Sequence, residues 1–333
     1  MNTAEAMPPL TFAPILKEKV WGGRRLETLG KPLPDGTSVG ESWELADLDT
    51  TSASGGGGDA AHSVVARGPH AGRTLRDLVA SAPGAVLGSG DASAGAFPLL
   101  IKFLDANQNL SVQVHPSPAY AASHAGAHLK TESWYIVDAE PGAVIYKGVR
   151  EGVSREQFAA AIEAGAVEDL LIAVPVRRGD FHHLPSGTCH ALGGGILVAE
   201  VQTPSDTTFR VYDWGREGRE LHIEPSLACI EFGPPARLEP IRARDGARRT
   251  PLEANEFYEL AELRFEAGET ETISSPGIAT VRMHLEGRGV LVSDDNESLE
   301  LTGGVTVLLP AFMPTTHARY DTSTVILEAR LPA

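Results

Sequence analysis

Residues 97–116, FPLLIKFLDANQNLSVQVHP, contain two short apolar runs separated by the polar segment DANQN. Comparable runs rich in Val, Ile, Leu and Phe occur at 132–137, 143–146, 196–202 and 208–212, and 35 glycines and 23 prolines punctuate the chain. Short strands divided by turn residues are typical of β-sandwiches and β-barrels. The sequence therefore predicts a mainly β fold.

Few segments have the apolar spacing of a helix. The best spans residues 155–174, where Ser154 and Gln157 occupy the two positions of a capping box and Pro175 ends the pattern. A shorter helix is expected after Thr74, with Asp77 as the second residue of its box. We expect both helices to be appendages that cover a barrel.

A domain boundary is predicted near residues 233–250, because this stretch is rich in Pro, Gly and Arg and has little periodicity. Beyond it, short strands are expected at 257–265, 278–285, 289–292, 305–309 and 325–329. The length of 333 residues is enough for about two domains. We therefore expect a larger domain at residues 1–235, with helical insertions, and a smaller C-terminal β-barrel domain at 245–333.

The chain is acidic, with 28 Lys and Arg against 44 Asp and Glu and a formal net charge of −16. Such a surface repels polyanions, so nucleic acid is not expected as a partner. No apolar run approaches the roughly 20 residues of a membrane helix, and the first residues lack the basic and apolar regions of a secretory signal. With only two cysteines, these features predict a cytoplasmic protein without a disulfide framework or a membrane partner.

A set of polar residues has the composition of a metal site. Because side chains alternate between the faces of a strand, Gln113 and His115 are expected to point the same way, and so are Lys130 and Glu132. His190 follows a turn containing Pro and Gly. Two imidazoles, a carboxylate and an amide oxygen suit a divalent ion such as zinc. The spacing alone leaves open that the four residues are satisfied separately by hydrogen bonds on a barrel wall.

The spacing of Gly179, Pro185, Gly187 and His190 resembles the second cupin motif, whose histidine is a metal ligand. The first cupin motif is matched poorly, because a Gln-x-His pair replaces His-x-His and residues 116–131 look like an insertion before the glutamate.

That deviation resembles the class I mannose-6-phosphate isomerases (phosphomannose isomerases) in their short bacterial form. The matching segments follow the family order and cover about residues 12–225. They are WGGRRL at 21–26, GESWE at 40–44, FPLLIKFLDANQNLSVQVHP at 97–116, KTESWYI at 130–136, LPSGTCHALGGGILVAEVQTPSDTTFRVYDWGR at 184–216 and LHI at 221–223.

The resemblance implies a bicupin-like fold of jelly-roll barrels and a reversible isomerisation of D-mannose 6-phosphate and D-fructose 6-phosphate. It implies one zinc ion per chain, and class I enzymes of this kind are often monomers. The site residues it implies are the metal ligands Gln113, His115, Glu132 and His190, the catalytic arginine Arg210, the acidic residue Glu200 and the substrate-pocket lysines Lys102 and Lys130. Some relatives have a histidine immediately before the pocket lysine, but this chain has Leu129, so that proton carrier is not transferred.

The residues themselves allow more than one interpretation of the pocket. Lys102 is the only charge within 97–104, so its ammonium either reaches solvent or meets an anion in a cavity. Arg210 lies between two apolar residues, and its alternative role is a structural salt bridge with Glu200 or Asp206. Ser111 is a candidate neutral donor to the substrate. Candidates for the wall of the pocket are Trp21, Trp43 and Glu44, and structural packing is an equally good interpretation of the two tryptophans.

In the expected mechanism Glu200 moves a proton between C1 and C2 through a cis-enediol(ate), while Lys102, Lys130 and Arg210 compete for the phosphate. Two alternatives remain at this stage, a metal-dependent cupin oxygenase and a non-catalytic cupin that binds a sugar phosphate. An oxygenase gives the candidate phosphate-binding cations no purpose, and a binding module has no need of the complete ligand set.

Overall fold

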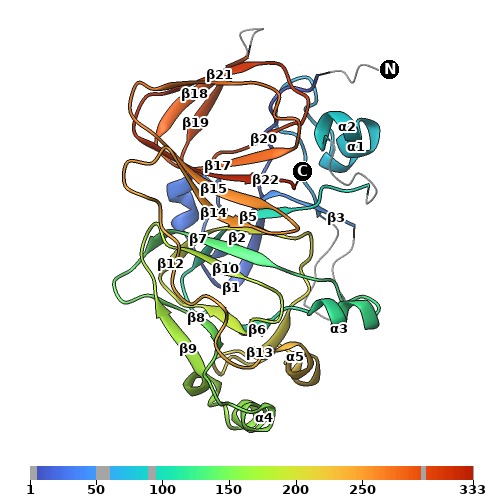
Figure 1. Ribbon diagram of the computed structural model, residues 1–333, viewed down its shortest axis with the longest axis vertical. Coiled ribbons are helices and arrows are strands. Elements are labelled where there is room, and N and C mark those ends of the chain that lie inside the picture. Colours follow the sequence, from blue (N-terminus) through green and yellow to red (C-terminus); the bar gives the residue numbers. More distant parts are fainter. Residues whose placement is uncertain (1–5, 50–60, 89–94, 294–297, 333) are drawn as a thin grey trace.

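The computed structural model describes residues 6–49, 61–88, 95–293 and 298–332. Its elements are mainly strands, which confirms the predicted fold class, and they form two pairs of sheets that lie one above the other along the long axis of the molecule (Figure 1).

The first pair of sheets is built from strands between residues 15 and 212 in the described part of the chain. One sheet has the order β1 (Ile15–Gly23), β2 (Val39–Leu45), β5 (Leu100–Ala106), β12 (Ile196–Gln202), β7 (Glu132–Ala139) and β10 (Phe181–Leu184). The other has the order β13 (Phe209–Tyr212), β6 (Val112–Val114), β11 (His190–Leu192), β8 (Val144–Val149) and β9 (Leu171–Pro175). A short ribbon joins β3 (Asp47–Leu48) to β4 (Ala61–His62).

The second pair follows residue 248. Its larger sheet has the order β14 (Arg249–Ala254), β15 (Glu259–Phe265), β22 (Thr324–Arg330), β17 (Thr280–Glu286) and β20 (Thr306–Leu309). The facing sheet has the order β16 (Thr270–Ile273), β21 (Thr316–Tyr320), β18 (Arg288–Ser293) and β19 (Ser298–Thr302).

In the six-stranded sheet of the first pair, the inner strands β5 and β12 are buried on both faces. This explains why they are mostly apolar and show no clear alternation. On β5, Phe103 packs in a core shared with the C-terminal strands, whereas Leu104 packs in the interior of the first pair. On β7, Tyr135 and Trp134 divide in the same way. Polar side chains on the same face of this sheet as Leu104 and Trp134 therefore point into the interior of the first pair of sheets.

The helices cover the outside of the sheets. They are α1 (Leu75–Ser81), α2 (Pro83–Val86), α3 (Pro118–Ser123), α4 (Arg155–Ala164) and α5 (Ile223–Cys229), with short 3₁₀ turns at Arg25–Leu29 and Val167–Leu170. Both predicted capping boxes are present, at Thr74 with Asp77 and at Ser154 with Gln157. No helix among the described residues is long and apolar enough to cross a bilayer.

The prediction of a helix over 155–174 is wrong in its second half. Helix α4 ends at Ala164 and is capped by Gly165, whose φ of +67° lies in the left-handed region that favours glycine. The apolar residues that follow form β9, which pairs with β8. Leu171 is buried in this strand, so its apolar character came from the sheet and not from a helix face.

Several contacts cross the domain boundary that the sequence predicts. Leu10 forms an isolated bridge with Leu308, and Gly88 forms one with Ile278. Helices α1 and α2 therefore lie beside the C-terminal sheets (Figure 1). The core between the two sheet pairs is continuous, with Phe103 and Leu308 in one cluster. Division into domains at 1–235 and 245–333 stays a prediction.

Candidate active site

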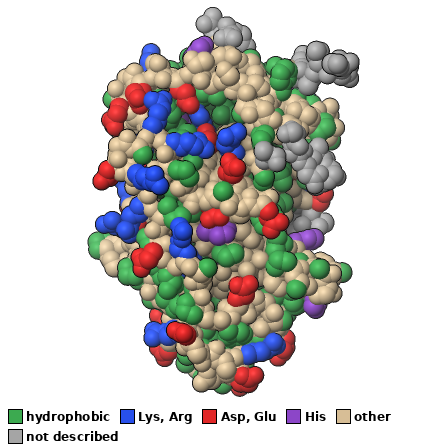
Figure 2. Space-filling model, in the orientation of Figure 1, with side chains coloured by type: hydrophobic (Ala, Val, Ile, Leu, Met, Phe, Trp, Pro, Cys, Tyr) green, Lys and Arg blue, Asp and Glu red, His purple; other side chains and the backbone are tan. Residues whose placement is uncertain are grey.

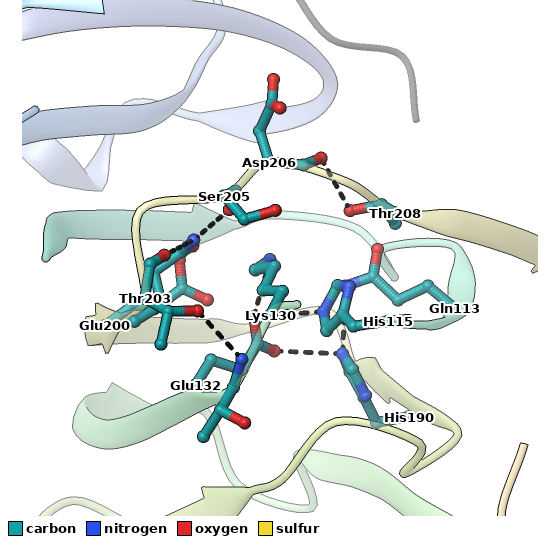
Figure 3. Close-up of polar contacts among 12 residues, drawn as sticks. Gln113, His115, Lys130, Glu132, His190, Glu200, Thr203, Ser205, Asp206 and Thr208 are labelled. Atoms are coloured by element: carbon teal, nitrogen blue, oxygen red, sulfur yellow. Dashed lines mark hydrogen bonds and ion pairs between the residues drawn. The ribbon is translucent and has the colours of Figure 1, made fainter. Parts of the chain in front are cut away.

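Three buried side chains from different strands converge inside the first pair of sheets. His115 follows β6, Glu132 begins β7 and His190 begins β11. Glu132 Oε2 lies 3.3 Å from His115 Nε2, and Glu132 Oε1 lies 3.0 Å from His190 Nε2 (Figure 3). All three residues are at most 1% exposed. The structure thus brings together three of the four residues predicted as metal ligands.

Backbone carbonyl groups set the orientation of both imidazole rings. His115 Nδ1 lies 3.0 Å from the carbonyl oxygen of Thr207, and His190 Nδ1 lies 2.8 Å from that of Thr188. A carbonyl can only accept, so each Nδ1 carries the proton and each Nε2 keeps a lone pair directed at Glu132. His115 Nε2 has no hydrogen-bond partner among the described residues. Three electron-pair donors therefore face one another, and a divalent cation fits between them.

Burial and the neighbouring charges hold His115 and Glu132 in the forms that bind a metal. Burial, together with the charge of Lys130, lowers the pKa of His115 to about 3. Burial acts to raise the pKa of Glu132, but the charge of Lys130 opposes it and the two neighbouring imidazoles add to that effect, which holds the pKa well below its ordinary value. Lys130 Nζ lies 2.7 Å from Glu132 Oε2.

Gln113 completes the predicted set from β6. It is the cross-strand neighbour of His190, and its Nε2 lies 3.2 Å from His190 Nε2. Rotation of the terminal amide by half a turn exchanges its nitrogen for its oxygen. Gln113 is therefore placed to offer an amide oxygen to an ion held by His190.

A cavity of about 200 Å³ opens beside this cluster. Every residue predicted to bind substrate or take part in catalysis lines it, and so does Gln113; these residues are Lys102, Ser111, Lys130, Glu200 and Arg210. They come from five different segments of the chain between residues 100 and 212. The fold therefore joins the metal-type cluster to a pocket that carries both cations and a carboxylate.

Glu200 and Lys102 form a buried ion pair in this cavity. They are cross-strand neighbours on β12 and β5, with 3.1 Å between Glu200 Oε2 and Lys102 Nζ. Trp134 Nε1 donates to Glu200 Oε1 at 3.0 Å. Burial raises the pKa of Glu200, with Glu132 adding to the effect and Lys102 opposing it. Lys102 is 5% exposed, so its ammonium does not reach solvent but meets carboxylates of the protein.

Arg210 reaches the same cavity from β13. Its Nη1 donates to the carbonyl oxygen of Glu220 at 2.7 Å, and its buried Nε has no hydrogen-bond partner among the described residues. Burial and the neighbouring Arg219 lower its pKa below the ordinary value for arginine. Because a guanidinium keeps its proton in proteins, Arg210 offers a fixed positive charge with donor capacity to spare.

Several residues of the cavity wall were not predicted from the sequence. Glu41 on β2 accepts from Trp43 Nε1 at 2.6 Å and lies 2.9 Å from Lys19 Nζ and 3.6 Å from Lys102 Nζ. Glu44, which had been considered for the wall, instead pairs with Lys31 at 2.6 Å. The alternation of Glu41 with Trp43 was the signal available in the sequence. Other wall residues not predicted are Lys17, Asp206, Thr208 and Arg219.

Comparison with known proteins supplies a family for this arrangement. Residues 10–145 match the family described as phosphomannose isomerase type I, catalytic domain. The mannose-6-phosphate isomerase of Streptococcus mutans is 40% identical over 261 residues, which cover 75% of this chain and 77% of that protein.

Solved structures agree with the sequence comparison. The mannose 6-phosphate isomerase of Bacillus subtilis has a TM-score of 0.82 at 30% identity, over 97% of this chain and 99% of that one. A mannose 6-phosphate isomerase bound with zinc and yttrium shares the fold, with a TM-score of 0.73 at 17% identity over 98% of this chain and all of that one (100%). The extent of these matches, together with a His–Glu–His cluster beside a cationic cavity, establishes that the chain belongs to the type I phosphomannose isomerases.

Proposed function

We propose that this protein interconverts D-mannose 6-phosphate and D-fructose 6-phosphate. The observation that carries the proposal is the position of the His115–Glu132–His190 cluster beside a cavity lined by Glu200 and by Lys102, Lys130 and Arg210. Such a cavity offers a base for a carbon-bound proton and positive charge for a phosphate. The relatives named mannose-6-phosphate isomerase support the choice of substrate.

The proposed metal is a single zinc ion held by His115, Glu132, His190 and Gln113. The two imidazole nitrogens, the carboxylate and the amide oxygen suit zinc, and a structural neighbour binds zinc. When bound, zinc supplies Lewis acidity that favours negative charge on a neighbouring oxygen. The protein's part is to hold both histidines in the Nδ1-protonated form through Thr207 and Thr188.

Glu200 is the proposed proton carrier. A base that moves a proton from C2 to C1 of the open-chain sugar converts the aldose to the ketose through a cis-enediol(ate), while a second proton moves from O2 to O1. Burial raises the pKa of Glu200, which brings its carboxylate closer to the strength that a general base needs near neutral pH. Lys102 opposes this effect and fixes the carboxylate in place, so we assign it a positioning role as well as a contact with substrate.

The phosphate is assigned to the cations of the same cavity. Lys102 is engaged by two carboxylates, Glu200 and Glu41, whereas Lys130 is engaged by one, Glu132. Lys130 and Arg210 are therefore the main candidates. Ser111 lines the cavity and supplies a neutral hydroxyl. The protein is further proposed to act as a cytoplasmic monomer without a nucleic-acid or membrane partner, as its composition and family suggest.

A coupled assay of the purified protein tests the proposal. Mannose 6-phosphate is supplied and fructose 6-phosphate is measured before chelator treatment, after it, and after zinc is returned. We expect activity to be lost with the metal and recovered with zinc. Failure of the zinc-loaded protein to form fructose 6-phosphate, or full activity in protein shown to be metal-free, would contradict it. An oxygen electrode in the same assay separates an isomerase from an oxygenase, because isomerisation consumes no oxygen.

A further inference from the structure

A second cavity, of about 580 Å³, lies where the two pairs of sheets meet. Its floor comes from β8 and β10, and its wall comes from residues 235–244 and from β14. Val149 N donates to the carbonyl oxygen of Gly233 at 3.3 Å, and Phe181 and Ile241 exchange hydrogen bonds at 2.9 Å. The wall is therefore attached to the floor by backbone hydrogen bonds to β8 and to β10. None of the residues that line this junction cavity lines the substrate cavity.

Lys147 is a buried cation that faces the junction cavity. It lies on β8, lines the cavity and is 2% exposed. Within the described part of the chain, no hydrogen bond or ion pair of its side chain is present. Burial, with the charge of Arg237, lowers its pKa to about 8 against the opposing charge of Glu253, so it remains largely protonated at neutral pH. Buried charges in proteins are normally paired, so a cation directed into a cavity without a hydrogen-bond or ion-pair partner points to an anionic ligand.

Two arginines line the same cavity at its surface. Arg237 and Arg244 are exposed, and across the described residues neither guanidinium forms an ion pair. In Figure 2 Lys and Arg side chains gather on the left half of this face, from the C-terminal sheets down to the level of the junction. This gathering stands out because the whole chain has a net charge of −16. Local attraction of an anion is therefore possible on a protein that repels polyanions.

Two carboxylates also line the cavity. Glu253 on β14 is partly buried and lines the cavity, and Glu239 lines it from the segment 235–244. A carboxylate accepts hydrogen bonds from hydroxyl groups, whereas a lysine and two arginines bind phosphate oxygens. Cavities of about 300–1,000 Å³ hold small-molecule ligands. A ligand with a phosphate at one end and hydroxyls at the other matches both sets of groups.

We propose that the junction cavity is a second binding site, which takes a small phosphorylated polyol or sugar with its phosphate on Lys147, Arg237 and Arg244. The site is separate from the substrate cavity but close to the metal cluster in the sheet. Lys147 is the direct cross-strand neighbour of His190, and His183, which lines the cavity, bonds to Ser133 next to Glu132. A ligand here is thus placed to influence the metal ligands without competing for substrate residues.

Calorimetric titration with inorganic phosphate, the simplest probe of this chemistry, tests the proposal. The decisive variant is Arg237→Met with Arg244→Met, because both residues are exposed and outside the catalytic machinery. We expect this double variant to lose one phosphate site per chain, or to bind phosphate at that site at least tenfold more weakly, with kcat and KM unchanged in phosphate-free buffer. Lys147→Met should remove the same site, and glycerol 3-phosphate should follow the same pattern as phosphate.

The matched control is Arg242→Met with Arg248→Met. Arg242 lies within the wall segment and Arg248 just beyond it; neither lines the cavity, and they pair with Asp180 and Glu269. Loss of two arginines makes the same change in net charge as the test variant. The control should leave the phosphate titration as in the wild type. Equal loss in both double variants would assign the binding to net charge and overturn the proposal. An unchanged titration in Arg237→Met with Arg244→Met would overturn it as well, whether or not Lys147→Met folds.

Discussion

The ammonium of Lys102 lies 3.1 Å from Glu200 Oε2, and the two residues face each other directly across β5 and β12. Glu41 holds the same ammonium from β2 at 3.6 Å. A lysine between two carboxylates has less free charge to offer a phosphate than its position in the sequence suggested. It also opposes the effect of burial on Glu200, because a nearby positive charge favours the ionised carboxylate.

Changing Lys102 to Met should therefore move the pH dependence of the reaction. Without the ammonium, the pKa of Glu200 rises further. On acidification the carboxylate is then protonated, and lost as a base, at a higher pH than in the wild type. We expect the acidic limb of the kcat/KM profile to shift to higher pH. Lys31→Met is the control, since Lys31 forms an equally buried pair with Glu44 away from the cavity. An unshifted acidic limb in Lys102→Met would separate Glu200 from the ionisation that limits activity.

Glu200→Gln tests the proton transfer itself. The amide keeps nearly the same shape but cannot accept the C2 proton, and general-base catalysis contributes about 10²–10⁴-fold to rate. Exchange of the C2 proton with solvent, followed by NMR in deuterium oxide, should slow by a factor in that range while metal content stays at the wild-type level. Unchanged exchange in the metal-loaded variant would remove Glu200 as the base.

His115→Ala should release or weaken the metal and abolish activity. The side chain supplies one of three converging ligand atoms and lies outside the main apolar clusters, so the fold should survive. Metal analysis after dialysis and circular dichroism measure the two effects separately. His124→Ala is the matched control, because His124 is exposed and stacks on Tyr120. Full metal retention in His115→Ala would refute its assignment as a ligand.

The sequence predicted those strands whose pattern of apolar and polar residues matches the burial of their faces in the structure. β5 and β12 are largely apolar runs because both of their faces are buried, and the spacing of Gln113 with His115 follows from strand alternation. β1 was not predicted, because Lys17 and Lys19 face the cavity and interrupt its apolar pattern.

Other features depend on contacts that a single sequence does not reveal. The apolar segment 170–174 suits a helix or a strand equally, and pairing with β8 decides in favour of the strand. The choice of Glu41 over Glu44 for the cavity depends on which face of β2 points into the interior of the first pair of sheets. Glu44 is buried away from the cavity, where Lys31 donates both to it and to the carbonyl oxygen of Gly304.

Lys130→Met should weaken binding of the phosphorylated substrate. Loss of one charge-assisted contact costs about 1.5–3 kcal/mol, which corresponds to a rise in KM of about ten- to a hundredfold. Lys130 also lies 2.7 Å from Glu132, so metal content must be measured alongside the kinetics. Unphosphorylated mannose should be a poor substrate of the wild type and should lose little in the variant. Equal turnover of mannose and its 6-phosphate by the wild type would contradict the phosphate assignment.

Arg210→Lys distinguishes charge stabilisation in the transition state from a ground-state clamp on the phosphate. The substitution keeps one positive charge but removes the planar fork, including the Nε that has no hydrogen-bond partner among the described residues and the Nη1 contact to Glu220. If Arg210 acts on the developing enediolate, the turnover number falls with little change in KM; if it holds only the phosphate, KM rises instead.

Arg216→Lys is the control, because Arg216 bonds to Asp213 and to the carbonyl oxygen of Asn109 but does not line the cavity. The control should retain wild-type kcat and KM. Wild-type kinetics in Arg210→Lys as well would contradict both roles for the planar fork, because the one property that the substitution removes would then have no part in either step.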